Sequence, residues 1–198
     1  DTFIVENNFG ADTIIGGEAS GETGDSDTVD FSLLSAGMTV IYSANETANA
    51  TDNTDTLGFS EVEALTMTDH DDVVDATNTT QGVSVLGKAG DDILTGGDGG
   101  DTLAGGDGND YIDGGAGDDT FTVSAQDGLV RITDFAANAD ADQIDVSALA
   151  PFFADPQALM AALSFSDGET TFDVDLTVGT RQVAIQSDEE LEESDFLF

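Results

Sequence analysis

The stretch that decides the fold is residues 87–122, which read GKAGDDILT, GGDGGDTLA, GGDGNDYID and GGAGDDTFT. Each of these four nine-residue units has Gly at its first and fourth places, Asp at its sixth place and an apolar residue at its eighth place. The eighth-place residues are Leu94, Leu103, Ile112 and Phe121. A pattern that keeps its phase through four units predicts a repeated structural element and not a disordered linker.

The two halves of each unit predict a tight turn followed by a short strand. Glycine at the first, second and fourth places permits the positive φ values that tight turns need, and Lys88 is the exception at a second place. The last three residues, such as 93–95, predict a strand with one inward apolar side chain. Such strands are stable only when neighbouring units stack and bury these side chains in one ladder.

The sixth-place carboxylates predict a calcium site in each turn. They belong to Asp92, Asp101, Asp110 and Asp119, and each follows small residues whose carbonyl oxygens are available as ligands. Calcium accepts six to eight oxygen ligands in a flexible arrangement, whereas magnesium prefers a rigid octahedron. The chain has no Cys, and its one His, His70, lies among Asp residues, which disfavours a zinc site.

This pattern resembles the RTX (repeats-in-toxin) family. The resemblance implies an all-β, right-handed parallel β-roll in which two units make one coil and calcium lies between turns two units apart. On this chain, Asp92 would share an ion with Asp110, and Asp101 would share one with Asp119 on the opposite edge. The expected main-chain ligands are at the first and third places: Gly87, Ala89, Gly96, Asp98, Gly105, Asp107, Gly114 and Ala116.

The charge balance constrains the possible partners. The chain of 198 residues has 42 acidic residues and only three basic ones, which gives a formal net charge of −39. Such a chain repels itself and needs bound cations to become compact. Nucleic acid and anionic membrane surfaces are excluded as partners, and no apolar run reaches the roughly 18 residues of a membrane span. Without Cys, calcium can provide the stability that disulfides give to other secreted proteins.

Two regions before the repeats are less regular. Residues 1–35 predict degenerate coils, with an insertion at 20–23 and with Asp12 and Asp27 as candidate ligands. The chain begins with DTFIV, which matches DTFTV at 119–123, so we expect it to be a piece of a longer protein. Residues 36–68 predict a flap hairpin over the side of the roll, with strands at 38–42 and 56–59 and a polar loop at 43–54. The regular roll then covers 69–127, where Asp72 is expected to share an ion with Asp92.

Residues 128–198 predict a β-rich cap. DQIDVSAL at 142–149 matches DTVDFSLL at 27–34, which indicates an internal duplication. A short helix is expected from Asp155 to about Leu163, with Pro156 in its first turn, followed by a hairpin of 171–176 and 182–185. The acidic stretch 188–195 and the apolar end 196–198 are similar to the C-terminal secretion signal of RTX proteins exported by type I machinery. A packed terminal strand is the structural alternative.

The sequence therefore predicts a calcium-binding module of a secreted bacterial protein, located outside the cell or on its surface. The module would fold on binding calcium after type I export. One alternative is a self-associating subunit of a surface layer, filament or adhesin. Another is the accessory C-terminal module of an extracellular enzyme whose catalytic domain lies upstream. A catalytic site is not expected here, because the sequence has no zinc-helix, nucleophile-elbow or phosphate-loop motif.

Overall fold

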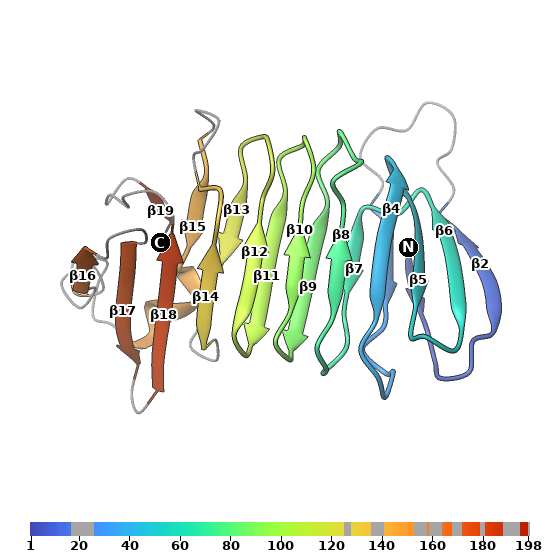
Figure 1. Cartoon of the computed structure of the whole chain (residues 1–198), viewed down its shortest axis with the longest axis horizontal. Coiled ribbons are helices and arrows are strands. Elements are labelled where there is room, and N and C mark those ends of the chain that lie inside the picture. Colours follow the sequence, from blue (N-terminus) through green and yellow to red (C-terminus); the bar gives the residue numbers. More distant parts are fainter. Residues whose placement is uncertain are drawn as a thin grey trace.

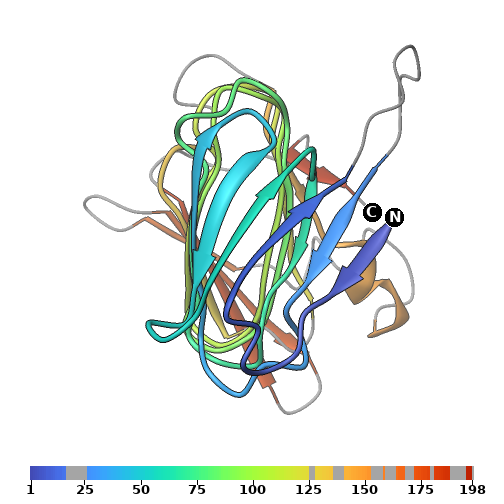
Figure 2. The ribbon, with the colours of Figure 1, turned by 90° about the vertical axis from the view of Figure 1, so that its right-hand side faces the viewer.

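Two sheets face each other along the molecule in the computed structural model, and the chain passes from one to the other in successive coils (Figures 1 and 2). The structure describes residues 1–16, 26–124, 128–135, 141–152, 158, 164–167, 172–178, 181–187 and 195–197. The first sheet consists, in spatial order, of β1 (Thr2–Ile4), β3 (Thr28–Asp30), β7 (Ala64–Thr66), β9 (Ser84–Ala89), β11 (Thr102–Asp107), β13 (Thr120–Thr122), β15 (Gln143–Asp145) and β19 (Phe196–Leu197).

The second sheet combines coil strands with inserted ones. Its spatial order is β16 (Ser164–Asp167), β17 (Phe172–Val178), β18 (Arg181–Ser187), β14 (Leu129–Ile132), β12 (Asp110–Asp113), β10 (Ile93–Thr95), β8 (Val73–Asp75), β4 (Thr39–Ala44), β5 (Thr47–Thr51), β6 (Thr56–Ser60) and β2 (Ala11–Ile15). We call the turns from the first sheet to the second edge 1, and those from the second to the first edge 2. In the repeats, edge 1 holds residues 87–92 and 105–110, and edge 2 holds 96–101 and 114–119.

Two nine-residue units make one coil, as the resemblance implied. Ile93 of β10 pairs in parallel with Tyr111 of β12, and Ser84 of β9 pairs with Thr102 of β11. Each pair is eighteen residues apart, the same separation as that of the hydrogen-bonded Asp92 and Asp110. Successive coils therefore place equivalent positions of the repeat beside one another. This confirms the predicted parallel β-roll.

The predicted apolar ladder forms the core. Leu94, Leu103, Ile112 and Phe121 are all fully buried between the sheets. Alternate residues of the same strands point outward, so Ile93 is 47% exposed and Tyr111 is 42% exposed. Because the inward side chain of one coil packs on that of the next, the ladder holds only when coils stack.

The predicted flap is instead part of the second sheet. β4 continues the roll by pairing in parallel with β8, and β5 and β6 follow it as antiparallel strands before β6 pairs in parallel with β2. The polar loop expected at 43–54 was wrong, because it contains β5. Ala48 and Ala50 of that strand are buried, while Asn49 between them is exposed. The insertion lengthens the roll and does not cover its side.

The C-terminal region ends the roll with a meander. β17 and β18 form the predicted hairpin, and β18 pairs in parallel with β14. β19 pairs with β15 and buries Phe196, which agrees with the packed terminal strand. The expected helix at 155–163 lies outside the described residues except for Ala158, as does the insertion at 20–23. Among the described residues, no helix has the length and apolar character needed to cross a bilayer.

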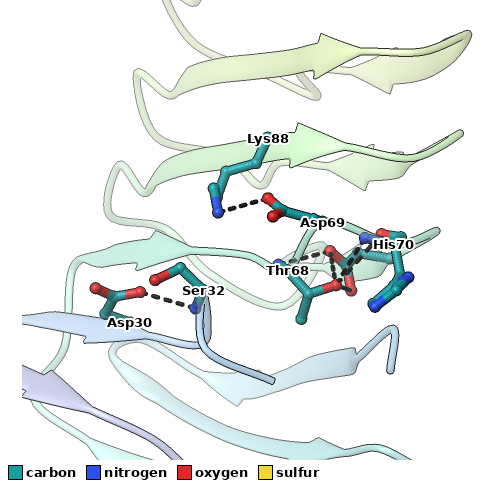
Figure 3. Close-up of polar contacts among 7 residues, drawn as sticks. Asp30, Ser32, Thr68, Asp69, His70 and Lys88 are labelled. Atoms are coloured by element: carbon teal, nitrogen blue, oxygen red, sulfur yellow. Dashed lines mark hydrogen bonds and ion pairs between the residues drawn. The ribbon is translucent and has the colours of Figure 1, made fainter. Parts of the chain in front are cut away.

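The internal duplication has a structural counterpart. After β3, the main-chain nitrogen of Ser32 donates a 2.8 Å hydrogen bond to Asp30 Oδ1, a contact drawn in Figure 3. After β15, the nitrogen of Ser147 makes the same 2.8 Å bond to Asp145 Oδ1, at the start of the 3-10 helix η1 (Ser147–Phe152). Aspartate-turn chemistry therefore ends equivalent strands in both copies.

We expect Leu94→Ala to lower the free energy of unfolding by about 2–5 kcal/mol, because it leaves a cavity in the ladder. Ile93→Ala should change it by less than about 0.5 kcal/mol, because that side chain faces solvent. Urea unfolding in excess calcium measures both variants. Equal losses would contradict the assignment of the inward and outward faces.

Candidate metal centre

The sixth-place carboxylates form a buried row along each edge. Asp92 and Asp110 lie on edge 1, and Asp101 and Asp119 lie on edge 2, each no more than 2% exposed. The main-chain nitrogen of Asp92 donates a 3.0 Å hydrogen bond to Asp110 Oδ1, and that of Asp101 donates a 2.7 Å bond to Asp119 Oδ1. The structure therefore brings together the two carboxylate pairs that were predicted to share ions.

Among the described residues, buried carboxylate oxygens without a hydrogen-bond donor occur on both edges. Asp92 Oδ2 and Asp119 Oδ2 are buried and accept no hydrogen bond, whereas Asp101 Oδ2 accepts a 2.8 Å bond from the nitrogen of Gly97. A buried carboxylate oxygen without a partner is costly, so native structures almost always supply a donor or a cation. These orphaned oxygens fit a cation ligand set.

First-place glycines leave room for these oxygens. A Cβ atom added to Gly87 would lie within 3.0 Å of both Asp92 Oδ2 and the carbonyl oxygen of Gly105 in the next coil. Gly96 has the same relation to Asp101 Oδ2 and the carbonyl oxygen of Gly114. A carboxylate oxygen and a carbonyl oxygen thus converge on one point in each turn.

The reason for the first-place glycine differs from the predicted one. The positive φ values in the repeats occur at second and fourth places, such as Lys88 at 80° and Gly108 at 145°, and the first-place glycines are not among them. Space for the converging oxygens, and not backbone conformation, explains glycine at the first place.

Main-chain oxygens would have to complete any ion's ligand shell. Within the described residues, no three Asp, Glu or His side chains are grouped closely enough to hold a metal by themselves. A groove of about 340 Å³ on edge 2 is lined by residues that include the predicted ligands Gly96, Asp98 and Ala116. On edge 1 the carbonyl of Asp107 accepts a 2.9 Å bond from the nitrogen of Gly90, so ligation there would replace that bond. A shell of carbonyls plus few carboxylates favours calcium.

The residues present therefore fit calcium. Asp92 and Asp110 would hold it on edge 1 with carbonyls of the Gly87 and Gly105 turns, and Asp101 and Asp119 would hold it on edge 2 with carbonyls of the Gly96 and Gly114 turns. Bound there, the ion would supply the positive charge and the coordination that the orphaned oxygens lack.

Hydrogen-bond donors from the protein satisfy the carboxylate of Asp72, which precedes the first regular turn of edge 1. Asp72 accepts a 2.9 Å bond from the nitrogen of Thr68 and another from its hydroxyl, and its Oδ1 also accepts from the nitrogen of Met38. Lys88 forms a 2.6 Å ion pair with Asp69, which Figure 3 shows near Thr68 and the exposed His70. The nitrogen of Asp72 also donates to Asp92 Oδ1. Asp72 thus lies in the predicted row, but its own oxygens are already bonded to donors.

The sequence reasoning missed Asp134 at the other end of edge 2. Its carboxylate accepts hydrogen bonds from the main-chain nitrogens of Gly114, at 3.0 Å, and Gly115. It follows Thr133, outside the nine-residue phase, so the repeat pattern gave no signal for it. The row itself continues to Asp142, whose Oδ1 accepts a 3.0 Å bond from the nitrogen of Asp119.

The two N-terminal candidate ligands, Asp12 and Asp27, lie in different kinds of position. Asp12 is exposed and pairs with Leu57 of β6, which puts it level with the inward apolar row and not with Asp92. The structure does not bring Asp12 to the other carboxylates. Asp27, by contrast, is fully buried at the sixth-place position on edge 2.

Burial shifts the pKa values of the row. Loss of solvent raises the pKa of Asp92 to about 7 and that of Asp119 to about 7, in each case with a further contribution from neighbouring carboxylates. Burial also raises the pKa of Asp101 to about 6. Without a cation, the folded row therefore favours protonated carboxyls.

The fold and the buried carboxylate rows define a parallel β-roll with calcium-type turns. The sequence model of the RTX calcium-binding nonapeptide repeat matches residues 86–121 in four copies. These residues of the chain are therefore four RTX calcium-binding repeats. No curated protein sequence matches the chain.

Solved structures that are similar to this chain include the following three. The R2 subunit of a mannuronan C5-epimerase from Azotobacter vinelandii is 26% identical, with a TM-score of 0.51, over 70% of this chain and 94% of that one. The R3 subunit of the same enzyme is 28% identical, with a TM-score of 0.49, over 66% and 79%. The extracellular lipase LipA from Serratia marcescens is 16% identical, with a TM-score of 0.44, over 96% of this chain and 34% of the lipase.

We expect the metal-free fold to be more stable at pH 5 than at pH 8. The folded carboxyls of Asp92 and Asp119 bind protons up to about pH 7, whereas their ordinary pKa is 3.8, so stability is lost as the pH rises between these values. In chelator, circular dichroism should show more β structure at pH 5. In saturating calcium the carboxylates are ionised in both states, and the difference should vanish. A metal-free chain that is equally folded at both pH values would contradict the burial of these groups.

Proposed function

We propose that this chain is a calcium-binding module of a secreted protein and that it folds when calcium fills its turns outside the cell. The observation that carries the proposal is the pair of buried, orphaned oxygens of Asp92 and Asp119 in turns of calcium-binding repeats. Binding free energy at such sites is folding free energy, because the ligands come together only in the folded coils.

The charge of the chain supports the same proposal. At net −39 and low calcium, self-repulsion keeps the chain extended, which suits passage through a narrow export channel. Extracellular calcium modules bind with Kd values of roughly 10⁻⁴ to 10⁻³ M. At about a hundredfold excess over Kd, each site contributes about 2.7 kcal/mol to the free energy of unfolding.

The proposed route of export is type I secretion, with residues 188–198 as the signal. In the folded chain, β19 packs against β15. This packing is compatible with a role of the same residues as an export signal, because export precedes folding. Transfer of a reporter fused to residues 128–198 by a type I exporter tests the route, and loss of transfer without 188–198 tests the signal.

The second candidate is an accessory module of an extracellular enzyme. It is favoured by the similarity to the R2 subunit of the epimerase, of which this chain covers 94%. In this case catalysis would belong to a separate domain of the parent protein. The complete coding sequence distinguishes the two candidates.

We expect calcium, but not magnesium at the same concentration, to convert the chain from disordered to β structure at pH 8. Asp110→Asn and Asp101→Asn should each raise the calcium midpoint by about tenfold or more, equivalent to about 1.4 kcal/mol. Asp107→Asn is the matched control: it removes the same charge from the same turn as Asp110, but the Asp107 side chain is exposed and the substitution keeps the main-chain carbonyl that is the expected ligand. Calcium titrations followed by circular dichroism measure the midpoints. Equal midpoints for Asp107→Asn and Asp110→Asn would count against the ligand assignment.

A further inference from the structure

A second pair of orphaned oxygens lies on edge 2, far from the repeats in sequence. Asp27 and Glu63 precede the paired residues Thr28 of β3 and Ala64 of β7, so they occupy the same position in adjacent coils. The nitrogen of Asp27 donates a 2.8 Å hydrogen bond to Glu63 Oε2, and the nitrogen of Ala64 donates a 3.0 Å bond to the carbonyl of Asp27. Asp27 Oδ2 and Glu63 Oε1 are buried and accept no hydrogen bond.

Gly16 completes the same arrangement that marks the repeat sites. A Cβ atom on Gly16 would lie within 3.0 Å of both Asp27 Oδ2 and the carbonyl oxygen of Glu61. Gly87 and Gly96 have the same relation to a carboxylate oxygen of their own turn and a carbonyl oxygen of the next coil. Glu61 lies beside Gly16 because the preceding residues, Ser60 and Ile15, pair. Its φ of 59° is left-handed, which is uncommon for a residue other than glycine.

We propose that Asp27, Glu63 and the carbonyl of Glu61 form a separate calcium site. Asp27 Oδ1 accepts a hydrogen bond from the main-chain nitrogen of Asp1, which leaves Oδ2 directed at Gly16 and the Glu61 carbonyl. Two carboxylates and a carbonyl make an all-oxygen set, which calcium prefers. The site lies outside the matched repeats, and it depends on the proposed function only for the identity of the cation.

Tyr42 separates this site from the repeat sites on edge 2. Ile41 pairs with Asp75, so Tyr42 lies beside Ala76, in line with Gly96 of the regular turns. Its fully buried ring contacts Phe59 edge-to-face at 5.9 Å between centroids. A large side chain thus fills the space at the start of the turn that glycine leaves open in the repeats.

The test counts bound calcium and measures amide exchange in the full chain. The variant is Asp27→Asn with Glu63→Gln, which keeps the size of both side chains. The matched control is Asp12→Asn with Glu6→Gln, which removes the same charge from exposed positions in the same region. We expect the site variant to bind one calcium ion fewer per chain than the control. We also expect it to lose the calcium-dependent slowing of exchange at residues 26–30 while keeping that at 93–95.

The outcomes separate this proposal from the proposed function. If calcium in the unaltered chain slows exchange at 93–95 but not at 26–30, the N-terminal site is wrong and the repeat sites stand. An unchanged ion count in the site variant also overturns the site. If neither segment responds to calcium, both proposals fail. Should the double variant not fold, Glu63→Gln alone, which leaves Asp27 in place, decides the question: one calcium ion fewer than the control supports the site, and an unchanged ion count overturns it.

Discussion

Buried carboxylate oxygens without hydrogen-bond donors are the constraint on which this roll depends. Stacking the coils buries the apolar ladder, but it also carries Asp92 and Asp119 out of water with one oxygen of each left without a partner. Packing of the apolar side chains does not remove the free-energy cost of burying these oxygens, because that cost comes from taking the carboxylates out of water without a partner. A divalent cation between coils offsets it and at the same time reduces the repulsion within a chain of net charge −39.

The first position of each turn, which we call a corner of the roll, is occupied in two ways. In the repeats, glycine leaves space for converging oxygens, as at Gly87 and Gly96. Beyond the repeats, fully buried side chains occupy equivalent positions: Met67 lies beside Gly87, Val123 lies in line with Gly105, and Tyr42 lies in line with Gly96. The flanking coils therefore depend less on calcium at these corners, and they give the repeat block packed neighbours on which to fold.

The sequence predicted the periodic repeats and the strands with clear alternation, such as the hairpin of β17 and β18, but it missed elements and ligands without either signal. The apolar ladder follows from a phase kept through four units. The two-unit coil and the pairing of Asp92 with Asp110 follow from the resemblance of these units to RTX repeats. β5 was missed because its alternating small residues, Ala48 and Ala50, have weak strand preference and lie between polar residues. Asp12 lies away from the predicted carboxylate row because β2 pairs with the inserted β6 and not with a regular coil. Asp134 and Glu63 lie outside the nine-residue phase, so only the structure shows their place on edge 2.

Small-angle X-ray scattering at neutral pH, with calcium and then with excess chelator, tests most directly whether the compact state depends on the cation. A folded chain of this length has a radius of gyration of about 16 Å, somewhat more if elongated, and an unfolded one about 48 Å. We expect the first value in calcium and a value near the second in chelator. A compact particle in chelator at neutral pH would contradict it.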